Sequence, residues 1–212
     1  KRAKAYTQYF DEETRFMRGK LADGSWRTPF DPVSAQHRVN DYCEGNAWQY
    51  LWMVPQDPEG LIELLGGDEP FVEKLDELFG LIGQYAHGNE PSHHTTYMYA
   101  YAGEQYKIAD KVDYILNELY TDKPDGLSGN EDCGQMSAWY ILSSMGFYSV
   151  NPSNGKDNIF IQSAILNGEA YTKSFITHKD IIKGGTLKFI MGAEPNKKFG
   201  KKDEDRPKSI VY

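Results

Sequence analysis

The chain is poor in cysteine, in basic residues and in long apolar runs, and each shortage argues against a class of protein. Its two cysteines, Cys43 and Cys133, are too few for a disulfide scaffold and lack CxxC spacing, so no cysteine-based metal site is expected. The 31 acidic residues outnumber the 23 basic ones, and the formal charge of −8 repels phosphate backbones and anionic lipid surfaces. No run reaches the roughly 18 apolar residues of a membrane helix. We therefore expect neither a nucleic-acid partner nor a membrane span.

Several catalytic signatures are also missing. The chain has no HExxH pair for zinc, no glycine-rich phosphate loop and no GxSxG elbow for a serine nucleophile. It opens on Lys1 and Arg2 without the apolar stretch of a signal peptide, so we expect any export signal to lie outside it. Zinc, nucleotide and serine hydrolase chemistry are therefore not expected.

The composition that is present suits a globular carbohydrate-active protein. With 212 residues and 40% hydrophobic content, the chain can bury the core of one domain, or of one and a half small ones. Aromatic residues make up 14% of it, including 15 Tyr and 4 Trp. Sugar sites have this mixture, because an aromatic ring covers the C–H face of a pyranose while polar groups bond its hydroxyls. Ordinary core packing is the alternative explanation for any one aromatic.

Hydrophobic periodicity divides the chain into a helical part and a β-rich tail. Residues 1–10 indicate the end of a helix, and residues 11–34 a long irregular loop. Six helical patterns follow, at 43–53, 58–65, 68–79, 92–102, 105–120 and 133–145. Antiparallel strands are then predicted within 158–168, 171–178 and 184–191. The predicted fold is mainly α over 1–146, followed by a small antiparallel β region over 147–212.

One local arrangement occurs three times at the mouth of an aromatic-rich helix: EGN at 44–46, GNE at 88–90 and GNE at 129–131. Glycine and asparagine suit a tight loop there, and an acidic residue suits a helix N-terminus. Helix capping explains each copy taken alone. Three copies together also fit helical hairpins in a ring, whose loops direct carboxylates toward a shared cavity.

Two of these loops carry candidate acid–base residues. Glu44, Trp48 and Trp52 fall at i, i+4 and i+8, so a helix over 43–53 would place them on one face. At the third loop Glu131 and Asp132 are adjacent, so one can cap the helix while the other projects into the cavity. Glycoside hydrolysis needs two carboxyl groups, one to protonate the leaving oxygen and one to activate water or attack the sugar.

The second loop and its helix carry histidines and oxygen donors. His93 and His94 are adjacent, and adjacent helical side chains diverge by about 100°, so the two are poorly placed to bind one metal. A structural role is the alternative for each. Asn89 and Glu90 instead offer the hard oxygen ligands that calcium prefers.

These motifs stand within longer blocks that together resemble the glycoside hydrolase family 92 α-mannosidases. In the helical part the blocks are FMRGKLADGSW (16–26), FDP (30–32), DYCEGNAWQYLWMVPQD (41–57), GQYAHGNEPSHHTTYMYAYAG (83–103) and DGLSGNEDCGQMSAWYILSSMGFYSVNP (125–152). In the tail they are IQSAILNG (161–168) and GGTLKFIMG (184–192). They span nearly the whole chain in the family's order.

The resemblance implies an architecture larger than this chain. It implies that 1–146 is part of an (α/α)6 toroid and that 147–212 is the closing β region. A β-sandwich domain and the remaining barrel helices are expected upstream, as a partner within the same protein. The implied protein is a periplasmic or secreted, calcium-dependent, inverting exo-α-mannosidase that releases terminal α-mannose from glycans.

The resemblance also implies roles for individual residues. Glu44 matches the general acid and Asp132 the general base that activates water. Asn89 and Glu90 match the neighbourhood that holds calcium. The residues expected to line the sugar site are Trp48, His93, His94 and Glu131. The chain departs from many relatives at Asn130, where they have Asp, which reduces the charge near the base.

Two further functions are compatible with the same residues. A non-catalytic carbohydrate-binding domain would use the aromatic-rich site without the acid–base pair. A purely structural helical repeat would need a fixed period, and the three loops are unequally spaced.

Overall fold

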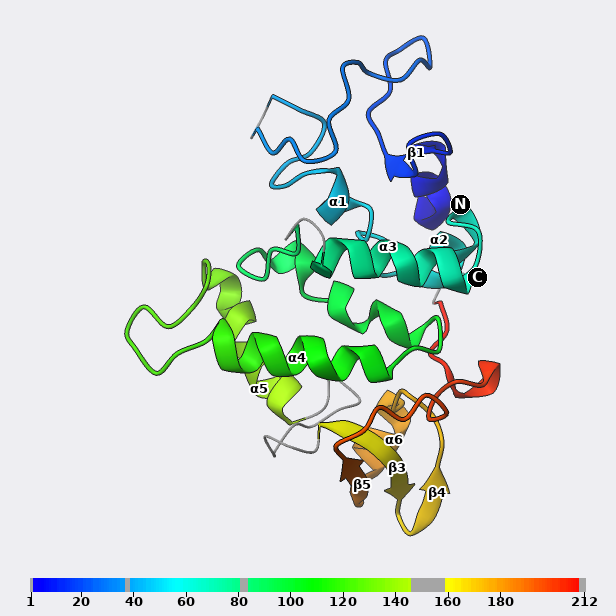
Figure 1. Ribbon diagram of the computed structural model, residues 1–212, viewed down its shortest axis with the longest axis vertical. Coiled ribbons are helices and arrows are strands. Elements are labelled where there is room, and N and C mark those ends of the chain that lie inside the picture. The colour runs from blue at the N-terminus through cyan, green and yellow to red at the C-terminus, as the bar shows by residue number, and fades with distance from the viewer. Residues whose placement is uncertain (1, 37–38, 81–83, 146–158, 210–212) are drawn as a thin grey trace. The chain divides into compact units, whose positions relative to one another are not determined.

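Helices make up most of the regular structure, and the strands are few and short (Figure 1). The computed structural model describes residues 2–36, 39–80, 84–145 and 159–209. The chain forms two compact units, Lys1–Thr95 with Ser209–Tyr212 and Thr96–Lys208, which are called the first and the second unit below. The boundary predicted between residues 146 and 147 lies outside the described residues.

The first unit begins with short elements where the sequence predicts the end of a helix and a long irregular loop. A 3₁₀ helix, η1 (Arg2–Gln8), precedes strands β1 (Phe10–Asp11) and β2 (Phe16–Met17), which pair antiparallel. An isolated antiparallel β-bridge pairs Lys20 with Trp26. The long loop is thus partly ordered by backbone pairing.

Three α-helices follow in the first unit: α1 (Ala47–Tyr50), α2 (Pro58–Leu64) and α3 (Asp68–Gly80). The ranges predicted at 58–65 and 68–79 are confirmed. Helix α3 buries Phe71, Leu75 and Leu78, at i, i+4 and i+7, so one stripe faces the core. Trp52 is fully buried and meets Phe71 edge-on, with ring centroids 5.3 Å apart.

A buried ion pair joins β1 to the residue that follows β2 in the first unit. Arg18 Nη1 lies 2.7 Å from Asp11 Oδ2, and the two side chains are only 8% and 6% exposed. The same guanidinium lies 4.4 Å from the ring centroid of Phe30. Burial alone raises the pKa of Asp11, but hydrogen bonds from Arg18 and Thr14 outweigh burial and hold that pKa below its ordinary value of 3.8.

Replacing Arg18 by Met is expected to destabilise the folded protein by about 3 kcal/mol, because a buried carboxylate then loses its cationic partner. Asp11 has a lowered folded pKa, so its ionised form stabilises the fold above pH 3.8, and this contribution is lost as the pH falls through the folded pKa. The difference between variant and native protein should therefore narrow in acid. Calorimetry of the full-length protein at pH 7 and pH 3 measures both effects.

Lys20→Met is the matched control, because Lys20 is exposed and its ammonium lies 4.2 Å from the centroid of the Trp26 ring. Exposed cation–π contacts contribute only about 0.5–1 kcal/mol. Equal melting temperatures for Arg18→Met and the native protein would show that the buried pair does not hold this segment.

The second unit contains most of a 3₁₀ helix and two longer α-helices. They are η3 (Thr95–Ala100), α4 (Tyr106–Glu118) and α5 (Gln135–Ser144). The predicted helices at 105–120 and 133–145 are confirmed, with α4 burying a stripe of Ile108, Val112 and Ile115. Helix α4 contacts both α5 and the sheet. The helix predicted at 92–102 instead forms two 3₁₀ segments, η2 (Glu90–Ser92) in the first unit and η3.

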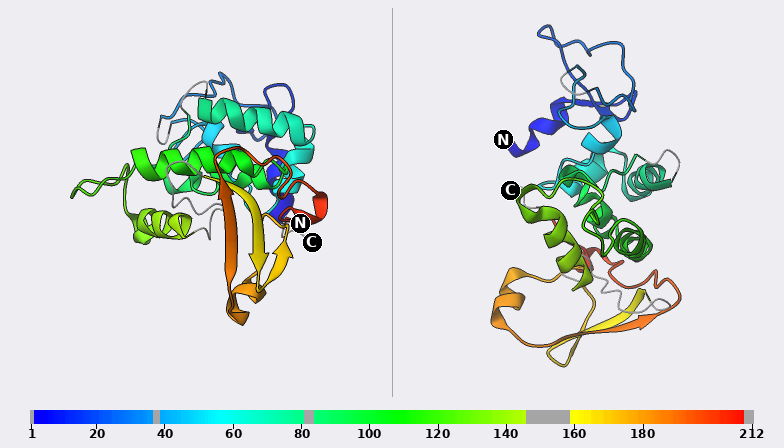
Figure 2. Two further views of the ribbon diagram at one scale, coloured as in Figure 1. Left: turned by 60° about the horizontal axis from the view of Figure 1, so that its bottom comes forward. Right: turned by 90° about the vertical axis from the view of Figure 1, so that its left-hand side faces the viewer.

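A three-stranded antiparallel sheet completes the second unit, with the order β4-β3-β5 (Figure 2). Its strands are β3 (Phe160–Leu166), β4 (Glu169–Tyr171) and β5 (Leu187–Gly192). Asn167 and Gly168 join β3 to β4 with φ of 53° and 90°, the left-handed pair that a two-residue hairpin turn requires. The predicted mainly α fold with a small antiparallel β region is therefore confirmed.

The remaining tail differs from the predicted strand at 171–178. Only Tyr171 of that range belongs to a strand, and the chain then enters the short helix α6 (His178–Lys183). Thr177 and Asp180 form a capping box that starts α6. A 3₁₀ helix, η5 (Asp203–Asp205), follows the sheet.

Candidate active site

Glu44 lies outside a helix, in a loop whose backbone is held on both sides. Its N–H donates to Tyr50 Oη at 3.1 Å, and its carbonyl oxygen accepts from Asn89 Nδ2 at 3.0 Å. The residue is exposed, so its carboxylate is accessible. The helical face predicted for Glu44, Trp48 and Trp52 is wrong, because α1 covers only Ala47–Tyr50.

The first two recurrent loops differ in how they cap the helix that follows each of them. Asn46 caps α1 in full: its side chain accepts from Gln49 N–H, and the Gln49 side chain accepts from the Asn46 N–H. Asn89 occupies the corresponding N-cap of η2 but makes no side-chain capping bond. Its amide bonds the carbonyl of Glu44 instead. The second loop thus contacts the candidate acid, 45 residues away in sequence.

Glu90 contributes an unusual buried oxygen to this loop. Its Oε1 is shielded from solvent and has no hydrogen-bond partner among the residues that the structure describes. A buried carboxylate oxygen without a donor is costly unless a cation compensates it. Because Asn89 donates through Nδ2, its Oδ1 remains an oxygen donor of the same hard type.

These oxygens fit a hard cation such as calcium. In the described residues no group of three or more His, Cys, Asp or Glu side chains is placed to hold a metal ion. Calcium takes amide and backbone oxygens, waters and carboxylates, so it does not need such a group. Asn89 and Glu90 are therefore suitable first ligands, with further oxygens needed to complete the shell.

His93 is buried and His94 is half-buried, and each imidazole faces a backbone carbonyl group. His93 Nε2 faces the His87 carbonyl oxygen at 3.0 Å, and His94 Nε2 faces that of Trp52 at 2.6 Å. A ring nitrogen opposite a carbonyl must carry the proton, so both imidazoles donate through Nε2. Burial lowers the pKa of His93 and of His94, and burial together with neighbouring His93 lowers the pKa of His87 to about 3.

Trp48 packs in the interior of the first unit. It is 6% exposed, meets Phe16 edge-on at 5.0 Å, and lies 4.0 Å from the Lys74 ammonium. Its indole N–H is buried without an acceptor in the described part of the chain. Burial lowers the pKa of Lys74. Phe16, Trp48 and Lys74 thus form a cation–π cluster in the first unit.

Glu131 and Asp132 differ in what their carboxylates contact. Glu131 accepts hydrogen bonds from the Ser137 hydroxyl and, at 3.1 Å, from the Ser137 N–H in the first turn of α5. These bonds lower the pKa of Glu131. Asp132 is exposed, and no hydrogen bond or ion pair engages its carboxylate among the residues the structure describes. Glu131 therefore caps the start of α5, whereas the Asp132 carboxylate is left exposed to solvent.

The backbone after Asp132 is strained. Cys133 adopts φ 55° and ψ 21°, a left-handed conformation that a non-glycine residue rarely takes, and Gly134 follows with φ 75°. Such residues persist only where the surroundings fix them, often at functional sites. Cys43 and Cys133 are both exposed and are not joined in a disulfide.

Sequence reasoning missed two contributors to the Glu44 loop. Tyr50 holds the Glu44 N–H, and Asp41 anchors the chain three residues before Glu44. Both stand in the block DYCEGNAWQY, so their closeness to Glu44 was visible. Their contacts depend on a turn that periodicity does not reveal.

Comparison with known proteins places the chain in a family. Residues 1–156 and 151–193 match the glycosyl hydrolase family 92 catalytic domain. A family GH92 α-mannosidase from Bacteroides thetaiotaomicron, solved with mannoimidazole, matches with a TM-score of 0.88 and 39% identity, over 97% of this chain and 33% of that one. An inverting mannosidase of the same family from Bacteroides thetaiotaomicron VPI-5482 matches with a TM-score of 0.85 and 32% identity, over 97% and 35%.

A curated relative agrees with these structures. An uncharacterized secreted glycosidase from Arthroderma benhamiae is 30% identical over 92% of this chain and 30% of its own length. The class indicated by all of these matches is that of the glycoside hydrolases. Within that class, the chain belongs to glycosyl hydrolase family 92. It spans about a third of the length of the relatives it matches.

No helix in the described part of the chain has the length and apolar character needed to cross a membrane.

Proposed function

We propose that the full-length protein is an inverting exo-α-mannosidase that releases terminal α-mannose from glycans. The observation that carries this proposal is the match to a family GH92 α-mannosidase at 39% identity and a TM-score of 0.88. The relative described as an inverting mannosidase supports the stereochemical outcome. The relative described as secreted supports a location outside the cytoplasm. Further barrel helices upstream would complete the toroid, and a β-sandwich domain would precede them.

The acid–base roles are part of this proposal, and the exposure of the two carboxyl groups supports them. In an inverting hydrolysis, one carboxylic acid protonates the leaving glycosidic oxygen, while a second carboxylate takes a proton from the water that attacks the opposite face of the sugar. We assign Glu44 as the acid and Asp132 as the base. Both are exposed, which lets substrate and water reach them. Glu131 is already engaged with Ser137.

The other residues bind and support the sugar. His94 donates through Nε2 to Trp52, so its Nδ1 is an acceptor suited to a sugar hydroxyl, and His93 has the same tautomer. Glu131 would line the sugar site next to the base, where its hydrogen bonds from Ser137 hold it in place. Trp48 would act from the interior, since it is buried against Phe16 and Lys74.

Calcium is the cofactor proposed for the Asn89–Glu90 loop, where Glu90 Oε1 is buried without a partner among the described residues. When bound, calcium supplies Lewis-acid and templating chemistry toward sugar hydroxyls. Asn89 also bonds the Glu44 carbonyl, so the loop that would hold calcium is joined directly to the loop that carries the acid.

Glu90→Gln is expected to weaken calcium binding by at least about tenfold, because a hard cation loses an anionic ligand while the side chain keeps its shape. Isothermal titration of calcium into the chelator-stripped full-length protein measures this loss without using activity. Glu104→Gln is the control, since Glu104 pairs with Lys201 in the second unit. Unchanged calcium affinity in Glu90→Gln would contradict the assignment.

Mannose release from a panel of α-linked mannobioses tests the function itself. The full-length protein is expected to release mannose from at least one linkage and to lose this activity in excess chelator. Saturable binding of every disaccharide without release of mannose would instead establish a carbohydrate-binding protein.

A further inference from the structure

We propose that the Arg27–Asp41 ion pair is a positioning device for Glu44, holding the loop so that the acid meets the leaving oxygen. This inference rests on the proposed role of Glu44. It concerns residues that touch neither the Glu44 side chain nor, in this proposal, the sugar. They act through the backbone of residues 41–44.

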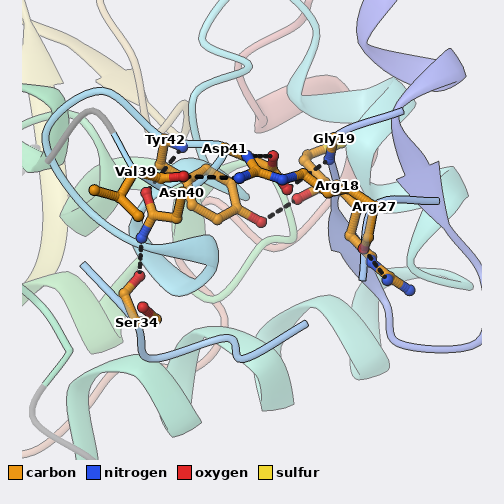
Figure 3. A network of polar contacts seen from close by, with 9 residues as sticks. Arg18, Gly19, Arg27, Ser34, Val39, Asn40, Asp41 and Tyr42 are labelled. Carbon is orange, nitrogen blue, oxygen red and sulfur yellow. Dashed lines mark hydrogen bonds and ion pairs between the residues drawn. The ribbon is translucent and has the colours of Figure 1, made fainter. Parts of the chain in front are cut away.

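Asp41 ties together three stretches of the long N-terminal loop (Figure 3). Its Oδ1 accepts from Arg27 Nη1 at 2.7 Å, and its Oδ2 accepts from the Gly19 N–H at 3.2 Å. The other arm of the same guanidinium, Nη2, donates to the Val39 carbonyl oxygen at 2.8 Å. Arg27 therefore holds the chain on both sides of Asn40, and Asp41 holds it against Gly19.

Gly19 provides the space for this carboxylate. A Cβ placed on Gly19 would overlap the Asp41 carboxyl group, so only glycine leaves room for that group at this distance. The side chain of Asp41 is only 19% exposed, against 46% for Arg27. The Asp41 carboxyl group thus packs directly against the backbone at Gly19.

Tyr42, which is one residue closer to Glu44, also anchors this segment. Its hydroxyl donates to the Met17 carbonyl oxygen at 2.5 Å, and burial raises its pKa, so it remains a protonated donor. The ring centroids of Tyr42 and Tyr50 lie 5.4 Å apart, and Tyr50 Oη accepts a hydrogen bond from the Glu44 N–H at 3.1 Å. The chain is therefore fixed at 41, at 42 and at 44.

Loss of the Arg27–Asp41 pair is expected to affect the position of Glu44 more than the free energy of folding. Ion pairs that are partly exposed contribute little to the free energy of folding. Misplacing a proton donor by about 1 Å, in contrast, can reduce turnover by about 10²-fold. Loss of the pair should therefore lower kcat while leaving stability and sugar binding nearly unchanged.

The choice of leaving group separates this role from a structural one. A sugar leaving group needs a proton from the acid, whereas 2,4-dinitrophenolate leaves without one. In the full-length protein, Asp41→Ala is expected to lower kcat on a mannobiose by roughly 10- to 100-fold. On 2,4-dinitrophenyl α-mannoside the loss should stay below about threefold, with KM for both substrates within about threefold, because sugar contacts are unchanged.

Graded variants and a matched control complete the test. Asp41→Asn can still accept one hydrogen bond, so it should retain more activity on the mannobiose than Asp41→Ala. Arg27→Met should reproduce the leaving-group pattern of Asp41→Ala. Asp203→Asn, which breaks a similar exposed pair with Lys208 (2.9 Å) in the second unit, should change neither substrate.

Glu44→Gln separates the failure of this inference from that of the proposed function. If Glu44→Gln shows the leaving-group pattern and the Asp41 and Arg27 variants act as the native enzyme, the positioning role is overturned alone. Equal losses on both substrates in Asp41→Ala, or a comparable rise in KM, would also overturn it. If Glu44→Gln itself shows no leaving-group dependence, the assignment of the acid fails first.

Discussion

Glu44→Gln is expected to lower kcat on a mannobiose by about 10²–10⁴-fold, the usual contribution of general acid catalysis. The amide has nearly the shape of the carboxyl group but cannot donate its proton to the glycosidic oxygen. Hydrolysis of 2,4-dinitrophenyl α-mannoside should fall by less than about tenfold, since its leaving group needs no proton. Steady-state kinetics on the two substrates measure both effects.

The control for this variant is Glu63→Gln, the same chemical change at an exposed glutamate of α2 in the first unit. Its leaving-group dependence should match that of the native protein. If Glu44→Gln retains native turnover on the mannobiose, another residue must be the acid.

Asp132→Asn is expected to lower turnover of both substrates by about 10²–10⁴-fold, because activation of water is needed whichever group leaves. The contrast with Glu44→Gln is the signature of an acid and a base with separate tasks. Stopped assays with enough enzyme to detect the residual rate, and circular dichroism to verify folding, are sufficient measurements.

Asp125→Asn is the matched control for Asp132→Asn, since Asp125 is another exposed aspartate of the second unit. Native rates are expected in that variant. A selective loss on the mannobiose alone in Asp132→Asn would give Asp132 the role of the acid and reverse the assignment.

Much of the fold could be predicted because burial leaves a periodic trace. Phe71, Leu75 and Leu78 mark the buried side of α3, and the same spacing locates α4. Regions without such a stripe were predicted less well. The helix expected at 43–53 is only four residues long, because Asn46 caps its start and leaves Glu44 in the loop. Helix α6 was missed although Thr177 and Asp180 carry its capping box.

The candidate site could be predicted in pieces but not as an arrangement. The motif around Glu90 indicated oxygen ligands, and the structure adds that Glu90 Oε1 is buried with no partner in the described ranges. The adjacent carboxylates at 131 and 132 allowed two assignments, and the Ser137 hydrogen bonds decide that Glu131 is the cap. The bond from Asn89 to the Glu44 carbonyl joins loops 45 residues apart. No local spacing reports such a contact, because it depends on how the intervening helices pack.

The stereochemistry of the first-formed product tests the central proposal most directly. Proton NMR of a concentrated reaction of the full-length protein with an α-mannoside, recorded before mutarotation, shows which anomer is released. An inverting enzyme with one acid and one base gives β-mannose first, with the α anomer growing in later. Release of α-mannose first would require a covalent intermediate and would contradict the roles of Glu44 as acid and Asp132 as base.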